Sequence, residues 1–408
     1  MTPRKREAWS AFSPPLMYDP SVRRFVVSVC AIGVVVSCHD LAGLGDYHPA
    51  ADGGGGAATT SSTGGAEPQP WLPDYPRRRR LTLATQPTTA DLEDFPSPII
   101  VVDDTELAEH AQPDGRDIVF TDADGMTPLH HEIETYDGGS GTLVAWVRLP
   151  LVRAASETTI YLYYGRADAT ALEPGTLTWS NAIYAGVWHL GESPSSAPPQ
   201  MKDSTDSAVD GVAEDDPLSV PGVAGDALAF DGTTAKVTIA DAPQLDVQPA
   251  GFAFSFWVKA PASATPGARP VQKIGGATSR GYVARLGSGP WNAELLDAGT
   301  PLSVTFGQED DFIEEWTHLA MSVDPDTGFL TAYTNGAVSE FARLGNLDLA
   351  ALGNAEPLYV SAPGGPFTGA VDELRIHVVA RSDDWFRLEH HALTAPGYLT
   401  SGNVELAP

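Results

Sequence analysis

The chain has 408 residues and a formal net charge of −29, from 53 acidic and 24 basic side chains. This charge disfavours binding to nucleic acid or to bare anionic membrane, because both attract positively charged proteins. Only two cysteines are present, Cys30 and Cys38, so the chain after Cys38 has no thiol for a disulfide. Stability must therefore come from the burial of apolar side chains, which a chain of this length can supply.

The first 37 residues have the features of a secretory signal. Two arginines precede the apolar segment 25–36, which is too short to span a bilayer as a helix. The segment ends in Val35-Val36-Ser37-Cys38, which resembles the bacterial lipobox, whose cysteine is lipidated and becomes the new N-terminus. The resemblance implies that Cys38 carries lipid, whether translation starts at Met1 or at Met17. Removal of the signal leaves 19 basic and 51 acidic side chains, a net charge of −32.

The expected location is therefore extracytoplasmic, with the protein anchored by lipid to the bacterial envelope. His39 follows Cys38, whereas an aspartate at this position signals inner-membrane retention in the enterobacterial sorting rule, so the outer membrane or cell surface is favoured. Residues 38–75 are rich in Gly, Ser, Thr and Pro and predict a flexible linker. Such a linker spans roughly 30–35 Å, which holds a folded body clear of the lipid headgroups.

Strand signals dominate the rest of the chain. Short β-branched or alternating runs separated by Gly-containing turns occur at 80–83, 99–102, 117–120, 143–149 and 159–164, and again at 235–239, 252–258, 319–323 and 328–333. They predict an all-β chain with two β-sandwich or jelly-roll domains, over residues 76–184 and 185–408. One short C-terminal helix is expected, with Ser382 as its cap and Asp383 and Asp384 in its first turn.

The stretch from Arg80 to about Tyr184 resembles the domain of unknown function DUF2341. The resemblance is carried by Arg80-Leu81-Thr82-Leu83, by residues 114–125, by Trp146-Val147-Arg148-Leu149-Pro150 and by the tyrosine run that ends at Gly165. The family has no assigned chemistry, so the match implies architecture and location. Because such modules also occur with transport proteins of the ExbB type, an envelope scaffold or transport accessory is one alternative function.

From about Val187 to the C-terminus the chain resembles LamG-like, concanavalin A-type jelly rolls. Six pieces occur in the family's order, namely 187–190, 227–232, 254–259, 316–320, 333–336 and 369–376. The resemblance implies a non-catalytic binding protein that recognises a glycan or a surface protein. Within it, Asn335-Gly336 predicts a tight hairpin turn, and the alternation of Phe254, Phe256 and Val258 predicts one core-facing side of a strand.

A structural calcium ion is implied by the same resemblance. LamG-like jelly rolls often bind calcium where the first and last strands of the domain meet, and Asp203 and Asp372 occupy the matching positions. Calcium prefers several hard oxygen ligands, so this pair of carboxylates is compatible with such a site but does not complete one. The histidine pairs 130–131 and 390–391 lack the spacing of a metalloprotease site, and no metal is assigned to them.

Three aromatic side chains are candidates for stacking on sugar rings. Trp291, Tyr282 and Trp179 lie near Gly- or Pro-containing turns, and we expect them to be exposed at a ligand-binding surface. Trp188, Trp257 and Trp316 fall in the core strands of the resemblance and are expected to be buried.

A glycosidase on the jelly roll is the enzymatic alternative. Residues 309–314 have the E-x-D-x-x-E spacing of retaining glycosidases that share this fold, with Glu309 and Glu314 as the carboxylates. An acidic residue follows Glu309 where those enzymes have an aliphatic one, and the motif falls on a loop of the resemblance. We therefore expect no catalytic residues.

Overall fold

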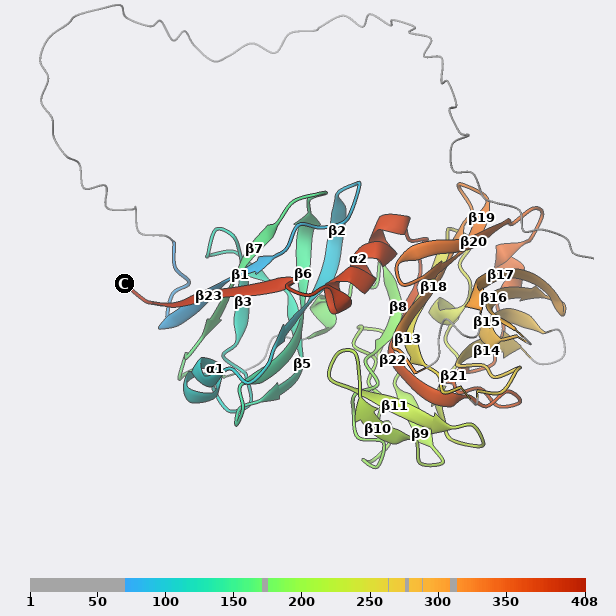
Figure 1. Ribbon diagram of the computed structural model, residues 1–408, viewed down its shortest axis with the longest axis horizontal. Helices are drawn as coiled ribbons and strands as arrows, with labels where there is room; N and C mark the ends of the chain where they lie inside the picture. The colour runs from blue at the N-terminus through green and yellow to red at the C-terminus, as the bar shows by residue number, and fades with distance from the viewer. Residues whose placement is uncertain (1–69, 171–174, 263, 276–278, 288, 309–313) are drawn as a thin grey trace, which may run out of the picture. The chain divides into compact units, whose positions relative to one another are not determined.

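The computed structural model describes residues 70–170, 175–262, 264–275, 279–287, 289–308 and 314–408 (Figure 1). The predicted lipidation site Cys38 and the motif residues 309–313 lie outside this part of the chain. Within it the secondary structure is dominated by strands, as predicted. None of the described helices is long and apolar enough to cross a membrane.

The first domain is built from two sheets whose strands are antiparallel. One has the order β23-β1-β7-β3-β4 and the other the order β2-β6-β5. The strands are β1 (Arg77–Leu83), β2 (Leu92–Val101), β3 (Val119–Asp122), β4 (Pro128–Leu129), β5 (His131–Asp137), β6 (Thr142–Val152), β7 (Thr158–Tyr164) and β23 (Leu399–Leu406), with the short helix α1 (Thr105–His110) between β2 and β3.

The last strand of the chain belongs to the first domain. β23 pairs antiparallel with β1, with Arg77 opposite Leu406 and Leu83 opposite Leu399 (Figure 1). The predicted jelly-roll range of 185–408 is therefore too long at its C-terminal end. The pairing covers the outer edge of β1, which would otherwise expose a row of unpaired backbone groups.

The end of the predicted linker also packs on this domain. Tyr75 is buried, and the Trp71 indole donates a hydrogen bond to the Tyr75 carbonyl. The guanidinium of Arg78 lies 4.4 Å from the centre of the Trp71 ring. Residues 70–75 are therefore part of the folded body rather than of a flexible linker.

The second domain is a jelly roll of two facing sheets. The sheet with the order β10-β11-β22-β13-β18-β19-β20, to which β8 adds by pairing with β22, contains β8 (Tyr184–Trp188), β10 (Leu218–Pro221), β11 (Asp226–Asp231), β13 (Phe252–Lys259), β18 (Thr317–Asp324), β19 (Phe329–Thr334), β20 (Ala337–Arg343) and β22 (Thr368–His377). The sheet with the order β17-β16-β15-β14-β21-β12-β9 contains β9 (Gly211–Glu214), β12 (Lys236–Ile239), β14 (Val271–Gly275), β15 (Arg280–Leu286), β16 (Pro290–Asp297), β17 (Thr300–Gln308) and β21 (Leu358–Val360). Short 3-10 helices occur at η1 (Gly175–Leu177), η2 (Pro243–Leu245) and η4 (Leu349–Leu352).

The local features predicted for the jelly roll are confirmed. Phe254, Phe256 and Val258 all belong to the buried core between its sheets. Asn335 and Gly336 join β19 to β20 with φ angles of 50° and 74°, and a hairpin turn with two positive φ angles is the kind that Asn-Gly favours.

Helix α2 (Asp383–Thr394) joins the two domains, and its N-terminus is the one predicted. The Ser382 side chain caps it by accepting a hydrogen bond from the backbone NH of Trp385. Its buried residues Trp385, Phe386 and Leu388 belong to a core cluster that also holds first-domain residues and Ala253 and Ala320 of the jelly roll. The outer face of the β13–β18 sheet is thus covered by α2 and the first domain.

Candidate functional site

Strand β5 presents two glutamates to the junction between the domains. The pairing of β5 with β6 shifts register at Glu134, between Ile133 and Thr135, and the side chains of Glu132 and Glu134 both contact His189. β5 is the edge strand of its sheet and pairs only with β6, where Glu132 lies opposite Trp146. The Trp146 indole donates a hydrogen bond of 2.8 Å to Glu134 Oε2, which fixes the position of that carboxylate.

The jelly roll supplies the other two members of the site. His189 directly follows β8, and Glu373 lies in β22, the strand with which β8 pairs. Glu373 has a φ of 51°, and the register between β13 and β22 shifts at this point, as in a β-bulge. The bulge keeps both Asp372 and Glu373 off the core face, while Val371 and Leu374 on either side pack into the core.

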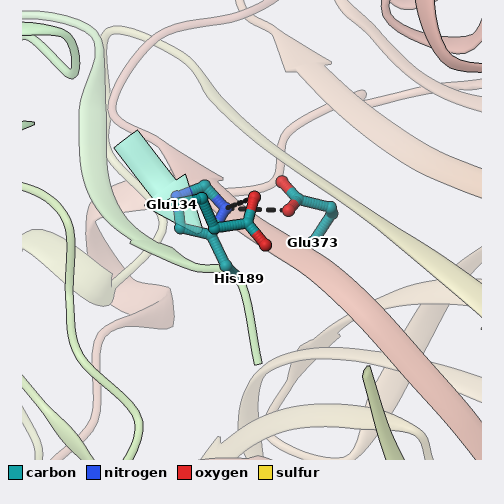
Figure 2. A group of neighbouring side chains, drawn as sticks. All are labelled: Glu134, His189 and Glu373. Carbon is teal, nitrogen blue, oxygen red and sulfur yellow. Dashed lines mark hydrogen bonds and ion pairs between the residues drawn. The ribbon is translucent and has the colours of Figure 1, made fainter. Parts of the chain in front are cut away.

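His189 contacts three carboxylates, those of Glu132, Glu134 and Glu373. Figure 2 shows His189 between Glu134 and Glu373. Its Nδ1 is 2.7 Å from Glu373 Oε1 and 3.6 Å from Glu134 Oε2, and its Nε2 is 3.2 Å from Glu132 Oε2. The imidazole is stacked on the Trp146 ring, with 5.6 Å between the ring centres and 16° between the planes. The ring orientation is therefore fixed by packing as well as by polar contacts.

The carboxylates of Glu132 and Glu373 also accept hydrogen bonds from other side chains. Glu132 accepts hydrogen bonds from the Trp179 indole and from the Ser204 hydroxyl, the latter at 2.8 Å. Glu373 Oε2 accepts from Arg375 at 2.7 Å, and Arg375 in turn reaches Glu389 of α2. The position of these groups is thus set by residues from both domains.

Burial and charge shift the pKa values of this cluster in opposite directions. Burial lowers the pKa of His189, but the charges of Glu373, Glu134 and Glu132 outweigh it and hold that pKa well above its usual range. Burial raises the pKa of the Glu134 carboxyl to about 8. For Glu132 burial also raises the pKa, yet the charge of His189 outweighs it, so the pKa of Glu132 is lowered. The carboxyl groups of Glu134 and Glu132 therefore differ in pKa, and Glu134 holds its proton the more tightly.

A cavity of about 680 Å³ opens beside the cluster. Its walls include Glu132, Glu134 and His189 together with three further carboxylates, Glu192, Asp203 and Asp226, and hydroxyls from threonine and serine. Lys202 is the one basic side chain, apart from His189, among the described residues that line it. The volume is within the usual range for small-molecule sites, and the lining is rich in hydrogen-bond acceptors.

The two predicted calcium ligands have backbone partners instead. Asp203 accepts hydrogen bonds from the backbone NH groups of Val187, Thr205 and Val209. Asp372 accepts from those of Val223 and Ala224. Among the described residues, the group with metal-ligand spacing is Glu134, His189 and Glu373, and it includes neither aspartate. Calcium binding at Asp203 and Asp372 stays a prediction.

The three aromatics predicted to face a ligand are buried, so that prediction is corrected. Tyr282 and Trp291 lie on β15 and β16 with 0% exposure in the jelly-roll core, where the Tyr282 hydroxyl donates to the Leu245 carbonyl. Trp179 is 1% exposed and serves instead to hold Glu132. For Tyr282 and Trp291, the alternation along the strands, rather than the nearby turns, decides where the side chains point. Of the predicted core tryptophans, Trp188 and Trp257 are buried and Trp316 is partly exposed.

The glycosidase motif can be judged only at its last residue. Glu314 lies between β17 and β18, outside both strands, with a φ of 61°. This agrees with the prediction that the motif is on a connecting loop. Residues 309–313 lie outside the described residues.

The cluster of His189 with Glu132, Glu134 and Glu373 was not predicted from the sequence. The run His131-Glu132-Ile133-Glu134 was recognisable as strand-like, and an acidic residue on each outward position was the available signal. His189 and Glu373 lay inside pieces that were assigned to the jelly-roll resemblance only. Their partnership needs a contact across 184 residues of sequence, which no local pattern indicates.

Comparisons with known proteins agree with the two-domain organisation. Residues 114–183 match the profile of the domain of unknown function DUF2341, and residues 231–385 match Laminin_G_3, described as the concanavalin A-like lectin/glucanases superfamily. The chain thus carries a DUF2341 domain followed by a concanavalin A-like domain. Glu132 and Glu134 lie in the first match, Glu373 lies in the second, and His189 lies between them.

Several solved structures align with about half of the chain. The binding domain of Paraclostridial Mosquitocidal Protein 1 aligns at 14% identity and a TM-score of 0.43, covering 52% of each chain. The receptor binding domain of botulinum neurotoxin C/D mosaic serotype aligns at 11% identity and a TM-score of 0.42, and the botulinum neurotoxin serotype G binding domain at 11% and 0.43. For both, the alignment covers 52% of this chain and 51% of the other. No curated protein matches the chain.

Proposed function

We propose that this protein is a lipid-anchored extracytoplasmic binding protein that recognises a carbohydrate in the cavity between its two domains. The observation that carries the proposal is the cavity of about 680 Å³ with convergent polar groups, beside a domain of the lectin/glucanases superfamily. Cavities at domain junctions are preferred positions for ligand sites.

The chemistry of the lining indicates the class of carbohydrate. Carboxylate oxygens accept hydrogen bonds and attract cations, so they suit the hydroxyl groups of neutral sugars and the ammonium groups of amino sugars. Glu134, Glu192 and Asp226 all face this space, and Lys202 is one basic side chain among several acidic ones. We therefore expect neutral or amino sugars to bind and uronic, sialylated or sulfated sugars to be rejected.

A glycan array with the full chain tests this function. Saturable binding to a neutral or amino sugar is expected, and Glu192→Gln or Asp226→Asn should weaken it at least tenfold. Asp114→Asn is the matched control, because Asp114 is an exposed carboxylate in a first-domain turn that does not line the cavity. Binding that none of these changes affects, or binding of anionic glycans alone, would contradict the proposal. No binding to any glycan would favour a protein partner.

Hydrolysis of the bound sugar is a second candidate function. Glu132 and Glu134 place two carboxyl groups at the wall of the cavity, and glycoside hydrolysis requires two such groups. Any glycan identified on the array can be incubated with the protein while reducing ends are measured. Product formation that is lost in Glu132→Gln and kept in Asp114→Asn would make the protein a glycosidase.

The lipid anchor at Cys38 is proposed from the sequence and is tested by a separate experiment. Labelling with radioactive palmitate in a bacterial host should mark the protein, and Cys38→Ala should abolish both the label and membrane recovery. Cys30→Ala is the matched control, because this cysteine lies inside the predicted signal. A label that persists in the Cys38 variant would rule out this anchoring site.

A further inference from the structure

We propose that Glu134, His189 and Glu373 bind a divalent transition-metal ion at the wall of the junction cavity. Each residue offers one ligand atom, and these atoms all lie within 4.8 Å of one another. A metal ion about 2.1 Å from each ligand places neighbouring ligand atoms about 3.0–3.4 Å apart. The separations from His189 Nδ1, 2.7 Å to Glu373 and 3.6 Å to Glu134, lie on either side of this range.

The surroundings of the three ligands have the form of a metal site. A histidine that binds metal through one ring nitrogen usually donates its other NH to a carboxylate, which fixes the tautomer and the ring orientation. His189 Nε2 is 3.2 Å from Glu132 Oε2, and Glu132 is itself held by Trp179 and Ser204. These supports lie behind the ligands and come from both domains.

Asp372, the residue before Glu373, has a buried carboxyl oxygen without a hydrogen-bond partner among the described residues. The residue has 0% exposure, and the oxygen is its Oδ1. Leaving a carboxyl oxygen buried without a partner is costly, and a dication at the neighbouring ligands would offset that cost.

The cavity supplies the route and the open coordination positions. Glu134 and His189 both line it, so an ion can reach the three ligands without opening the core. Solvent or a ligand in the cavity can then complete the coordination shell. This ligand set differs from the predicted calcium ligands, because it contains neither Asp203 nor Asp372.

The donor set favours a transition metal over calcium. Imidazole suits zinc and other late first-row metals, and carboxylates suit manganese, whereas calcium takes six to eight oxygen ligands. Two carboxylates and one imidazole therefore fit Zn²⁺ or Mn²⁺. The alternative to a metal site is an ion-pair cluster in which a protonated His189 occupies the place of the metal. In that case no specific metal binding is expected.

Metal titration of the full chain in detergent, without carbohydrate, separates these two structures. After EDTA treatment, isothermal titration with Zn²⁺ should give one saturable site per chain. Electron spin echo measurements with Mn²⁺ should show coupling to one imidazole nitrogen, which His189→Gln abolishes. Because no sugar is present, the outcome is independent of the proposed glycan binding.

Matched variants locate the ion. Glu134→Gln should weaken Zn²⁺ binding at least tenfold, and Glu132→Gln, which removes the support behind His189, should weaken it about 10–100-fold. Glu192→Gln, a carboxylate of the same cavity outside the ligand set, should leave the affinity unchanged. Asp203→Asn should also bind normally, which separates this site from the predicted calcium site.

The proposal fails if Zn²⁺ does not bind saturably, or if binding is equally strong in Glu134→Gln. It also fails if bound Mn²⁺ lacks nitrogen coupling, because the ion would then lie on surface carboxylates. Circular dichroism of each variant checks folding. Should Glu373→Gln unfold because Arg375 loses a partner, Glu134→Gln still decides the question, because the Glu134 side chain lies at the cavity wall.

Discussion

The two faces of the β13–β18 sheet are buried in different ways. The inner face packs Phe254, Phe256 and Leu319 into an apolar core with 0% exposure. The outer face, covered by α2 and the first domain, buries Arg375 and other charged or polar side chains almost as deeply: Ser255, His318, Glu373 and His377. The first surface stabilises the jelly roll, whereas the second costs desolvation energy and fixes how the domains meet. Buried charge at such a junction indicates a candidate functional site.

The largest effect should come from the apolar face. Phe254→Ala removes a fully buried ring that lies 6.0 Å from Phe256 and 5.9 Å from Tyr282, centre to centre. The cavity left behind should lower the free energy of unfolding by about 3–5 kcal/mol. Urea denaturation measures this change, and Phe254→Leu should lose less than half as much. Equal losses in the two variants would contradict packing as the cause.

The polar face should respond almost as strongly, but through charge. Arg375 bridges Glu373 at 2.7 Å and Glu389 at 2.5 Å, so Arg375→Met removes the guanidinium that these two buried carboxylates share. We expect a loss of about 3 kcal/mol. Adding Glu389→Gln should recover part of it, because one uncompensated charge disappears. Arg375→Lys should fall in between, since an ammonium lacks the planar fork that spans both partners. An Arg375→Met protein as stable as the original would show that the bridge contributes nothing.

A smaller effect is expected at the turn between β19 and β20, which lies against helix α2. Gly336 has a φ of 74°, and a Cβ placed there would lie 2.8 Å from the Cα of Arg387 in α2. Gly336→Ala should therefore cost about 2 kcal/mol through strain and a shift of the turn against the helix. Gly345→Ala is the matched control, since Gly345 also has a positive φ but no neighbour within 4 Å. A thermal shift assay compares them, and equal losses would exclude the contact with α2.

The smallest effect is a pH dependence of the polar face. Burial lowers the pKa of His390 to about 4, with His318 and His391 adding to the shift, below the unfolded value of about 6.5. The unfolded chain then binds more protons between these values, so stability should decrease as the pH falls from about 6.5 to about 4. After allowance for solvent screening at this half-buried ring, the loss is about 1–2 kcal/mol. His390→Gln should show a shallower decrease in urea denaturation at pH 7 and pH 5, whereas parallel curves would exclude this residue.

Patterns local in sequence predicted much of the fold. The alternation of Phe254, Phe256 and Val258, the Asn335-Gly336 turn and the cap at Ser382 all follow from interactions within a few residues. The candidate site could not be predicted in this way. Its residues come from β5, the end of β8 and a bulge in β22, and a bulge reverses the alternation that a pattern assumes.

The predicted sugar-stacking aromatics show the same limit. Trp291 lies one residue after Pro290, which suggested an exposed turn, yet it pairs with Leu286 on β15 and points into the core. The side on which a residue falls depends on the register of the strand, and a shift of one residue reverses it. Register is set by pairing with strands distant in sequence, so turns alone did not reveal it.

The pairing of β1 with β23 links the two ends of the folded body and has a consequence for biosynthesis. Arg78 of β1 contacts Glu405 of β23 across 327 residues of sequence. A ribosome makes the chain from its N-terminus, so the edge of β1 has no partner until almost the whole polypeptide has emerged. The first domain is translated early but completed late, and until β23 has formed its outer edge can pair with the wrong strand. A nonsense codon before Leu399 would thus damage the first domain, although the mutation lies after the jelly roll.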